Sequence, residues 1–257
     1  MNFLSKKEIP FPPLNYRQMV GPLDDASYDN KSGDYIWGPL DFYPLRPGEA
    51  YNSIFDFGCG CGRNARQLML QKRTIRKYVG IDASRLMIAW CQDNLSPIQS
   101  QYTFSHHDVY CTPYAPENTK NRYLPFPSPD NSFSLVNAHS VFTHLYADQS
   151  EFYLKEARRI LRKNGIIRGT WFFFNKDFFP VMQDSQNCLY VNENDPTQAV
   201  YYNWNYFLNV LKTLELALIS ITWTQIPGFQ NVVYLGRKDE FEDFAINIAP
   251  PKTIVGY

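Results

Sequence analysis

Three glycines at alternate positions, with an acid ahead of them, are the residues of this chain that point most directly to chemistry. The run Asp56-Phe57-Gly58-Cys59-Gly60-Cys61-Gly62 follows an apolar segment and precedes a helical pattern. Glycine adopts turn dihedrals that other residues avoid, and without a Cβ it lets a ligand approach the backbone closely. The loop would also face the positive end of the following helix. The run therefore predicts a nucleotide-binding loop.

The spacing of the glycines separates two classes of cofactor. A dinucleotide fingerprint needs Gly-x-Gly-x-x-Gly, and Arg63 stands where its third glycine would fall, so a nicotinamide oxidoreductase is the least favoured alternative. A second acid, Asp82, ends a short apolar segment and follows Gly62 at the distance, about 20 residues, where a ribose-binding carboxylate is expected. An ionised carboxylate can accept hydrogen bonds from both ribose hydroxyls. Asp82 alone is also compatible with a helix cap.

The glycine run, Asp82 and Asp108 together resemble the class I S-adenosylmethionine-dependent methyltransferases. The segments 124–136 and 156–165 resemble small-molecule members of that family, similar to those encoded among glycan or natural-product genes. The resemblance implies that Asp56 meets the cofactor ammonium, directly or through water, and that Asp108 and the Val109 amide meet the adenine. It extends the cofactor-binding set to Gly58, Cys59, Gly60, Gly62, Ala83 and Asn137.

A further expectation concerns the carboxylate end of the cofactor. In relatives, a residue of the N-terminal segment meets the cofactor carboxylate, which makes Arg17 a candidate; an ordinary surface arginine is the alternative.

All four histidines, at 106, 107, 139 and 144, fall on the rim where ligands bind in open α/β sheets. We predict His144 and His139 as candidate general bases for a hydroxyl acceptor, with structural hydrogen bonding as the alternative. His106 and His107 point to opposite faces if extended, so at most one faces the site.

Strand-like and helix-like segments alternate along the chain, which predicts a doubly wound α/β fold. The resemblance implies a Rossmann-like, mostly parallel sheet of seven strands that ends in an antiparallel hairpin, with helices on both faces. We expect one domain, 1–257, with an N-terminal flap (1–48), a core (49–238), an aromatic acceptor-side insertion (174–202) and a tail (239–257). The predicted strands are 51–57, 77–81, 101–105, 132–138, 165–173, 217–224 and 231–237, and the predicted helices are 62–72, 84–94, 148–162 and 203–215. Aromatic side chains of the insertion and just after it would stack on an acceptor or fill the core: Phe178, Phe179, Tyr201, Tyr202 and Trp204.

Composition narrows the partners. Lys+Arg and Asp+Glu number 25 each, so no charge excess favours nucleic acid. The five cysteines lack Cys-x-x-Cys spacing, which predicts free thiols in a reducing cytoplasm and no metal site. No apolar run approaches the ~20 residues of a membrane span. We therefore expect a cytoplasmic monomer or homodimer that methylates a small-molecule acceptor, foremost a hydroxyl of a sugar, glycan or secondary metabolite. A non-catalytic cofactor-binding sensor or partner subunit is the alternative.

Overall fold

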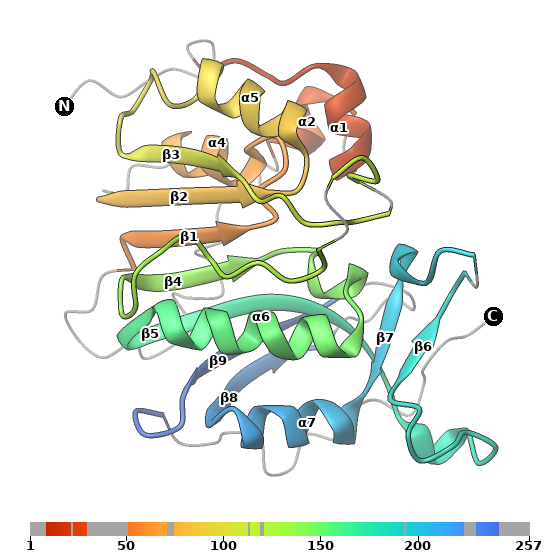
Figure 1. Cartoon of the computed structure of the whole chain (residues 1–257). Helices are drawn as coiled ribbons and strands as arrows, with labels where there is room; N and C mark the ends of the chain where they lie inside the picture. Colours follow the sequence, from red (N-terminus) through yellow and green to blue (C-terminus); the bar gives the residue numbers. More distant parts are fainter. Residues whose placement is uncertain are drawn as a thin grey trace.

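A mostly parallel sheet forms the centre of the computed structural model (Figure 1), which describes residues 9–21, 23–29, 51–70, 75–112, 114–118, 121–192, 194–223 and 230–241. Its parallel strands lie in the order β3-β2-β1-β4-β5. They are β1 (Ser53–Phe57), β2 (Lys77–Asp82), β3 (Tyr102–His106), β4 (Phe133–Ala138) and β5 (Leu161–Phe174). Beyond β5, β9 (Asn231–Arg237) and β8 (Leu216–Thr222) pair antiparallel. The predicted α/β fold and its closing hairpin are confirmed.

Within the described ranges the sheet has nine strands, where seven were predicted. The two additional strands, β6 (Cys188–Tyr190) and β7 (Val200–Asn203), form an antiparallel pair inside the predicted insertion. The end of β5 passes beyond β9 and pairs in parallel with β7, where Phe172 lies opposite Tyr201. Val200, Tyr201 and Tyr202 of β7 are residue types that favour strands. The pattern was missed because each strand is very short.

Helices cover both faces of the sheet, as predicted (Figure 1). Apolar residues of α4 (Arg63–Leu70) and α5 (Arg85–Asn94) share one hydrophobic cluster with Ile54 and Leu135. Those of α6 (Ala147–Ile160) and α7 (Trp204–Thr213) share another with Phe55 and Val136, which point to the opposite face. The described residues of 109–131 form no helix, in line with the proline-rich sequence there.

The described part of the N-terminal flap forms two short helices, α1 (Leu14–Val20) and α2 (Asp25–Tyr28), and Arg63 and Gln67 of α4 donate to the Tyr28 carbonyl at the end of α2. Arg66 of α4 is only 1% exposed and pairs with Asp29 at 2.8 Å. It also donates to the Ile9 carbonyl, and its guanidinium lies 3.8 Å from the centre of the Phe11 ring. The remainder of the predicted flap, and residues 242–257 of the predicted tail, lie outside the described residues.

The buried Arg66–Asp29 pair yields the first prediction. Replacing Asp29 with alanine leaves a buried guanidinium without its carboxylate, which typically costs about 3–5 kcal/mol. We expect the free energy of unfolding in urea to fall by about that amount, or, if the segment detaches alone, hydrogen exchange to accelerate across residues 9–29. Asp25→Ala is the matched control, because Asp25 pairs with Arg17 but its side chain is 67% exposed. Equal effects of the two variants would contradict the assignment.

Candidate functional site

The glycine loop has the open backbone that its sequence predicts. Gly58 and Gly60 adopt left-handed φ angles of 73° and 54°. A Cβ on Gly58 would lie 2.3 Å from the Val141 side chain, and one on Gly60 would lie 2.9 Å from that of Val20. Only glycine therefore fits both positions, which lie between β1 and the start of α4.

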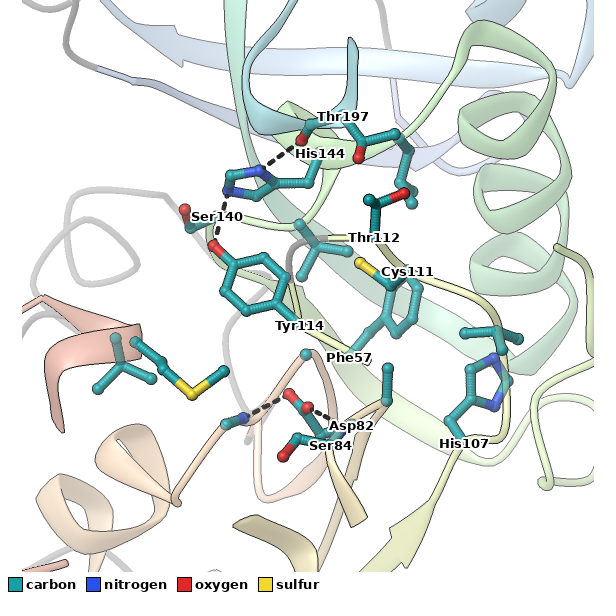
Figure 2. A pocket seen from close by; sticks show the side chains of 18 of the residues that line it. Phe57, Asp82, Ser84, His107, Cys111, Thr112, Tyr114, Ser140, His144 and Thr197 are labelled. Atoms are coloured by element: carbon teal, nitrogen blue, oxygen red, sulfur yellow. Dashed lines mark hydrogen bonds between the residues drawn. The ribbon is translucent and has the colours of Figure 1, made fainter. Parts of the chain in front are cut away.

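A cavity of about 690 Å³ opens beside this loop. Figure 2 shows part of its lining, which comes from the strand ends, the N-terminal segment and the predicted insertion. Six of the predicted cofactor-binding residues line it: Gly58, Cys59, Gly60, Asp82, Ala83 and Val109. Three histidines do so as well, His107, His139 and His144. The lining does not include Asp56, Gly62, Asp108, Asn137 or Arg17.

Asp82 joins the glycine loop to the turn after β2. One carboxylate oxygen accepts from the Gly60 amide at 2.8 Å, and the other accepts from the Ser84 amide at 2.8 Å (Figure 2). Ser84 in turn caps α5 by accepting from the Met87 amide. Burial raises the pKa of Asp82, and the two amides oppose that rise. Because each carboxylate oxygen has two lone pairs, the fixed group can still accept hydrogen bonds from a ribose.

Asp56 lies behind the loop in a buried row of polar side chains. It is 1% exposed, and Asn137 opposite it on β4 donates to it at 2.6 Å. Tyr78 donates to it as well, and Asn64 donates from α4 at 3.3 Å. Arg168, opposite Asn137 on β5, donates to the Asn137 amide oxygen at 2.9 Å. Burial raises the pKa of Asp56, whereas these donors and the Arg168 charge lower it.

The cofactor contacts predicted for Val109 and Arg17 stay predictions, and the structure shows which groups surround these two residues. The Val109 amide donates to the His107 carbonyl at 2.7 Å. Arg17 donates to the carbonyls of Pro12 and Leu23 and to the Asp25 carboxylate, so its guanidinium is engaged within the N-terminal segment. The residues directly after Arg17 reach the cavity instead: Gln18, Met19, Val20 and Gly21.

The turn after β4 brings the histidines of that segment to the cavity. Ser140 adopts a left-handed φ of 55°, and its amide donates to the Thr170 hydroxyl at 2.7 Å. Gln230, next to β9, donates to the Ser140 hydroxyl at 2.7 Å. The chain then enters the single turn η1 (Phe142–His144). Because the chain turns here, His139 and His144, which both follow β4, can line the same cavity.

His144 has a defined protonation state. Its Nδ1 lies 2.9 Å from the Thr197 carbonyl, and its Nε2 lies 3.4 Å from the Tyr114 hydroxyl (Figure 2). A carbonyl can only accept, so Nδ1 carries the proton and Nε2 has a lone pair. Burial lowers the pKa of His144, while the Thr197 carbonyl and the Asp195 carboxylate oppose that change. The ring is therefore neutral at neutral pH, with an unprotonated Nε2.

The other histidines are placed differently. Burial and the nearby Arg168 lower the pKa of His139 to about 3. Burial lowers the pKa of His107 to about 4, and its Nε2 bonds to the Tyr153 hydroxyl at 3.1 Å. His106 donates to the Ala83 carbonyl and is not among the residues that line the cavity. The alternation predicted for the adjacent pair is therefore observed.

The insertion reaches the cavity through residues that sequence analysis did not single out. Tyr202 and Trp204 lie in the core, and none of the five aromatic residues considered for stacking lines the cavity. The contribution of the insertion comes from the residues at and before the turn η3 (Pro196–Gln198), namely Asn194, Asp195, Pro196 and Thr197. Tyr114 and Arg63 were likewise missed, although Arg63 directly follows the glycine run.

Comparisons with known proteins agree with this architecture. Residues 55–168 match the family model described as Methyltransferase domain. A SAM-dependent methyltransferase from Leishmania major is similar at 12% identity, over 90% of this chain and 80% of that one, with a TM-score of 0.56. One from Aquifex aeolicus is similar at 15% identity, over 88% and 98%, with a TM-score of 0.51. The cyclase SpnF matches at 18% identity and a TM-score of 0.46, over 68% of this chain and 54% of its own length, so this chain spans about half of it.

At identities this low, the similarity to these structures shows a shared fold and nothing further. The matched domain model and these neighbours show the fold of S-adenosylmethionine-dependent methyltransferases, so S-adenosylmethionine is the cofactor against which the site is compared. The residues present fit that group, because Gly58 and Gly60 line the cavity of about 690 Å³ and the Asp82 carboxylate in the same lining is fixed by two amides. Across the described ranges, no group of three His, Cys, Asp or Glu side chains is arranged for a metal, and no helix has the length and apolarity of a membrane span.

The Asp82 carboxylate yields the second prediction. Asp82→Asn removes an ionised acceptor, and hydrogen bonds to charged groups contribute about 1.5–3 kcal/mol. We expect the Kd for S-adenosylhomocysteine, measured by calorimetry, to rise by about tenfold to a hundredfold. Asp93→Asn, on the exposed surface of α5, is the matched control and should leave the Kd unchanged.

The same group predicts a pH dependence of cofactor binding. Burial raises the pKa of Asp82 in the free protein, and ribose hydroxyls would stabilise its ionised form. Affinity should therefore be full above that raised pKa and fall as the pH drops through it, and this component should vanish in Asp82→Asn. Identical pH profiles for the wild type and Asp82→Asn would show that Asp82 does not bind the ribose.

Proposed function

We propose that this protein is an O-methyltransferase that transfers the methyl group of S-adenosylmethionine to a hydroxyl of a small polar acceptor, foremost a sugar, a glycan unit or a secondary metabolite. The observation that carries the proposal is the placement of His144, whose Nδ1 lies 2.9 Å from the Thr197 carbonyl while its Nε2 faces the Tyr114 hydroxyl in the same cavity as the glycine loop. A hydroxyl acceptor loses a proton on methylation, so a fixed neutral base suits this reaction.

The remaining lining supports a hydroxylated acceptor. Away from the glycine loop the cavity is lined by hydrogen-bonding side chains together with flat aromatic ones. They include Thr112, Arg122, Ser140, Gln149, Asn194, Asp195 and Gln230, with Tyr110, Tyr114 and Tyr146. Hydroxylated rings bind to such mixed walls, because hydrogen bonds fix their edges and aromatic faces cover their flat sides. We further propose that the acceptor is a small molecule and that the protein works in the cytoplasm.

The cofactor, when bound, supplies an electrophilic methyl group on a sulfonium. The glycine loop and Asp82 would hold it in place, while η1 and η3 hold the acceptor side. Aligning the two reactants in a dry cavity can supply ~7–11 kcal/mol. His144 would take the acceptor proton at Nε2, and a positioned base contributes ~10²–10⁴-fold. Alignment is therefore the larger contribution, and the base is the second.

The proposal is tested by separating binding from transfer. Calorimetry with S-adenosylhomocysteine measures cofactor binding, and tritiated S-adenosylmethionine measures transfer to a panel of neutral sugars, uronic acids, phenols and amines. Label on a hydroxyl of a sugar or phenol supports the proposal. Tight binding with no transfer to any acceptor would favour the non-catalytic sensor or partner subunit. Label that appears only on the amines would reject O-methylation.

The base itself yields the fourth prediction. His144→Gln should lower kcat for a hydroxyl acceptor by ~10²–10⁴-fold, because the acceptor proton loses its recipient. The Kd for S-adenosylhomocysteine should stay at the wild-type value, since His144 bonds to Thr197 and Tyr114 and not to the glycine loop. Parallel losses of kcat and cofactor affinity would assign His144 a structural role.

A further inference from the structure

Tyr114 occupies the position next to the basic nitrogen of His144. Its ring meets the His144 ring edge to face, with centroids 5.3 Å apart and planes at 86°. Its hydroxyl lies 3.4 Å from Nε2. Because Nδ1 carries the histidine proton, the phenol is the donor and Nε2 is the acceptor. Figure 2 shows the phenol pointing toward His144 from the side where Asp82 lies.

The segment that carries Tyr114 is anchored to the cofactor side of the cavity. Cys111 and Ala115 form an isolated bridge, and the Ala115 and Tyr114 amides both donate to the Cys111 carbonyl. Asn118 donates to the Ala83 carbonyl at 2.8 Å and to the Val109 carbonyl at 3.0 Å. Tyr114 is thereby held between the predicted adenosyl subsite and His144, where an acceptor hydroxyl would meet the phenol before the imidazole.

We propose that Tyr114 relays the acceptor proton to His144, an inference that rests on the proposed O-methyl transfer. As the acceptor oxygen forms its bond to the methyl carbon, the carbon–sulfur bond breaks and its electron pair stays on sulfur. The acceptor O–H proton passes to the Tyr114 oxygen while the Tyr114 proton passes to His144 Nε2. The products are the methyl ether, S-adenosylhomocysteine and an imidazolium, which then releases its proton to solvent.

The charges around the pair suit a relay rather than a stable phenolate. The Asp195 carboxylate and the Thr197 and Gln198 carbonyls face His144 and stabilise its protonated form. Burial, together with Cys111, Asp82 and Asp195, raises the pKa of Tyr114 to about 12. A phenol with that pKa keeps a proton at neutral pH and can pass one on only as it receives another.

The first test needs no acceptor. With four histidines in the chain, long-range ¹H–¹⁵N correlation of histidine-labelled protein can resolve the His144 nitrogens. We expect Nδ1 to be protonated and Nε2 unprotonated, and Tyr114→Phe to shift Nε2 and raise the pKa of His144 by removing a donor to its neutral form. Tyr110→Phe, another phenol of the cavity lining, is the control and should leave Nε2 unmoved. A protonated Nε2, or no shift in Tyr114→Phe, overturns the relay.

The second test uses the hydroxyl acceptor identified by the transfer panel. Tyr114→Phe should lower kcat by about 10²-fold at unchanged Kd for S-adenosylhomocysteine. For the wild type, the rate plotted against the fraction of D₂O should follow a curve, as expected when two protons move in the rate-limiting step. For Tyr114→Phe the plot should be a straight line, as expected when one proton moves. A rate in Tyr114→Phe within about threefold of the wild type overturns the relay and leaves O-methyl transfer standing. A wild type that transfers no methyl group overturns the proposed function itself.

Discussion

The site depends on one buried interaction, the row of polar side chains that crosses the sheet at Asp56. The apolar partners Ile54, Leu135 and Ile166 lie in register across β1, β4 and β5, and two residues further along the same face stand Asp56, Asn137 and Arg168. A carboxylate buried to this degree is tolerated only when donors and an opposite charge satisfy it. Asn137 donates to Asp56 and accepts from Arg168, and the Arg168 guanidinium supplies the opposite charge. The row therefore fixes the strand ends from which the glycine loop and the histidine turn emerge.

The outer wall of the glycine loop depends on the N-terminal segment. The Tyr28 hydroxyl donates to the Cys61 carbonyl at 3.3 Å, and Arg63 and Gln67 of α4 donate to the Tyr28 carbonyl. Val20 of the same segment lies against Gly60, so one packed unit supports the loop from outside and lines the cavity from inside. Breaking the buried Arg66–Asp29 pair would therefore affect cofactor binding indirectly, by loosening this packed unit. Neither Arg66 nor Asp29 lines the cavity.

The sequence could predict the features that local residue types encode. The strand-like segments that precede Asp56, Asp82 and Asp108, with glycines between the first two, are sufficient to predict a doubly wound α/β fold and the glycine loop. The predicted helix at 84–94 matches α5 because Ser84 caps it through a local contact. Asp56 shows the limit of this approach, since its partners Tyr78, Asn137 and Arg168 come from three other strands. No local sequence pattern indicates that an acid at the end of a strand faces a buried asparagine side chain.

The acceptor side was harder to predict for the same reason. His144 owes its tautomer to the carbonyl of Thr197, a backbone atom 53 residues away that has no signature in the sequence. Thr197 is brought there by the β6–β7 pair, whose strands are too short to be recognised by alternation. Tyr114 lies in a turn among prolines, where a single tyrosine gives no reason to expect catalysis. Of the five aromatic residues considered for stacking, Tyr202 and Trp204 lie in the core, whereas Phe178 is 54% exposed.

This division has a physical consequence for how such a site can change. The proposed cofactor half consists of glycine backbone and strand-end carboxylates, where a Cβ or a lost charge is costly. The proposed acceptor half consists of η1, η3 and the turn that holds Tyr114, which contribute side chains and carbonyls on connecting segments. Connecting segments generally tolerate substitution better than core elements do, although Phe142 of η1 is itself part of the core. Since alignment provides more of the expected rate than the base does, a new acceptor could be accommodated by changes in those segments while the row beneath the loop stays intact.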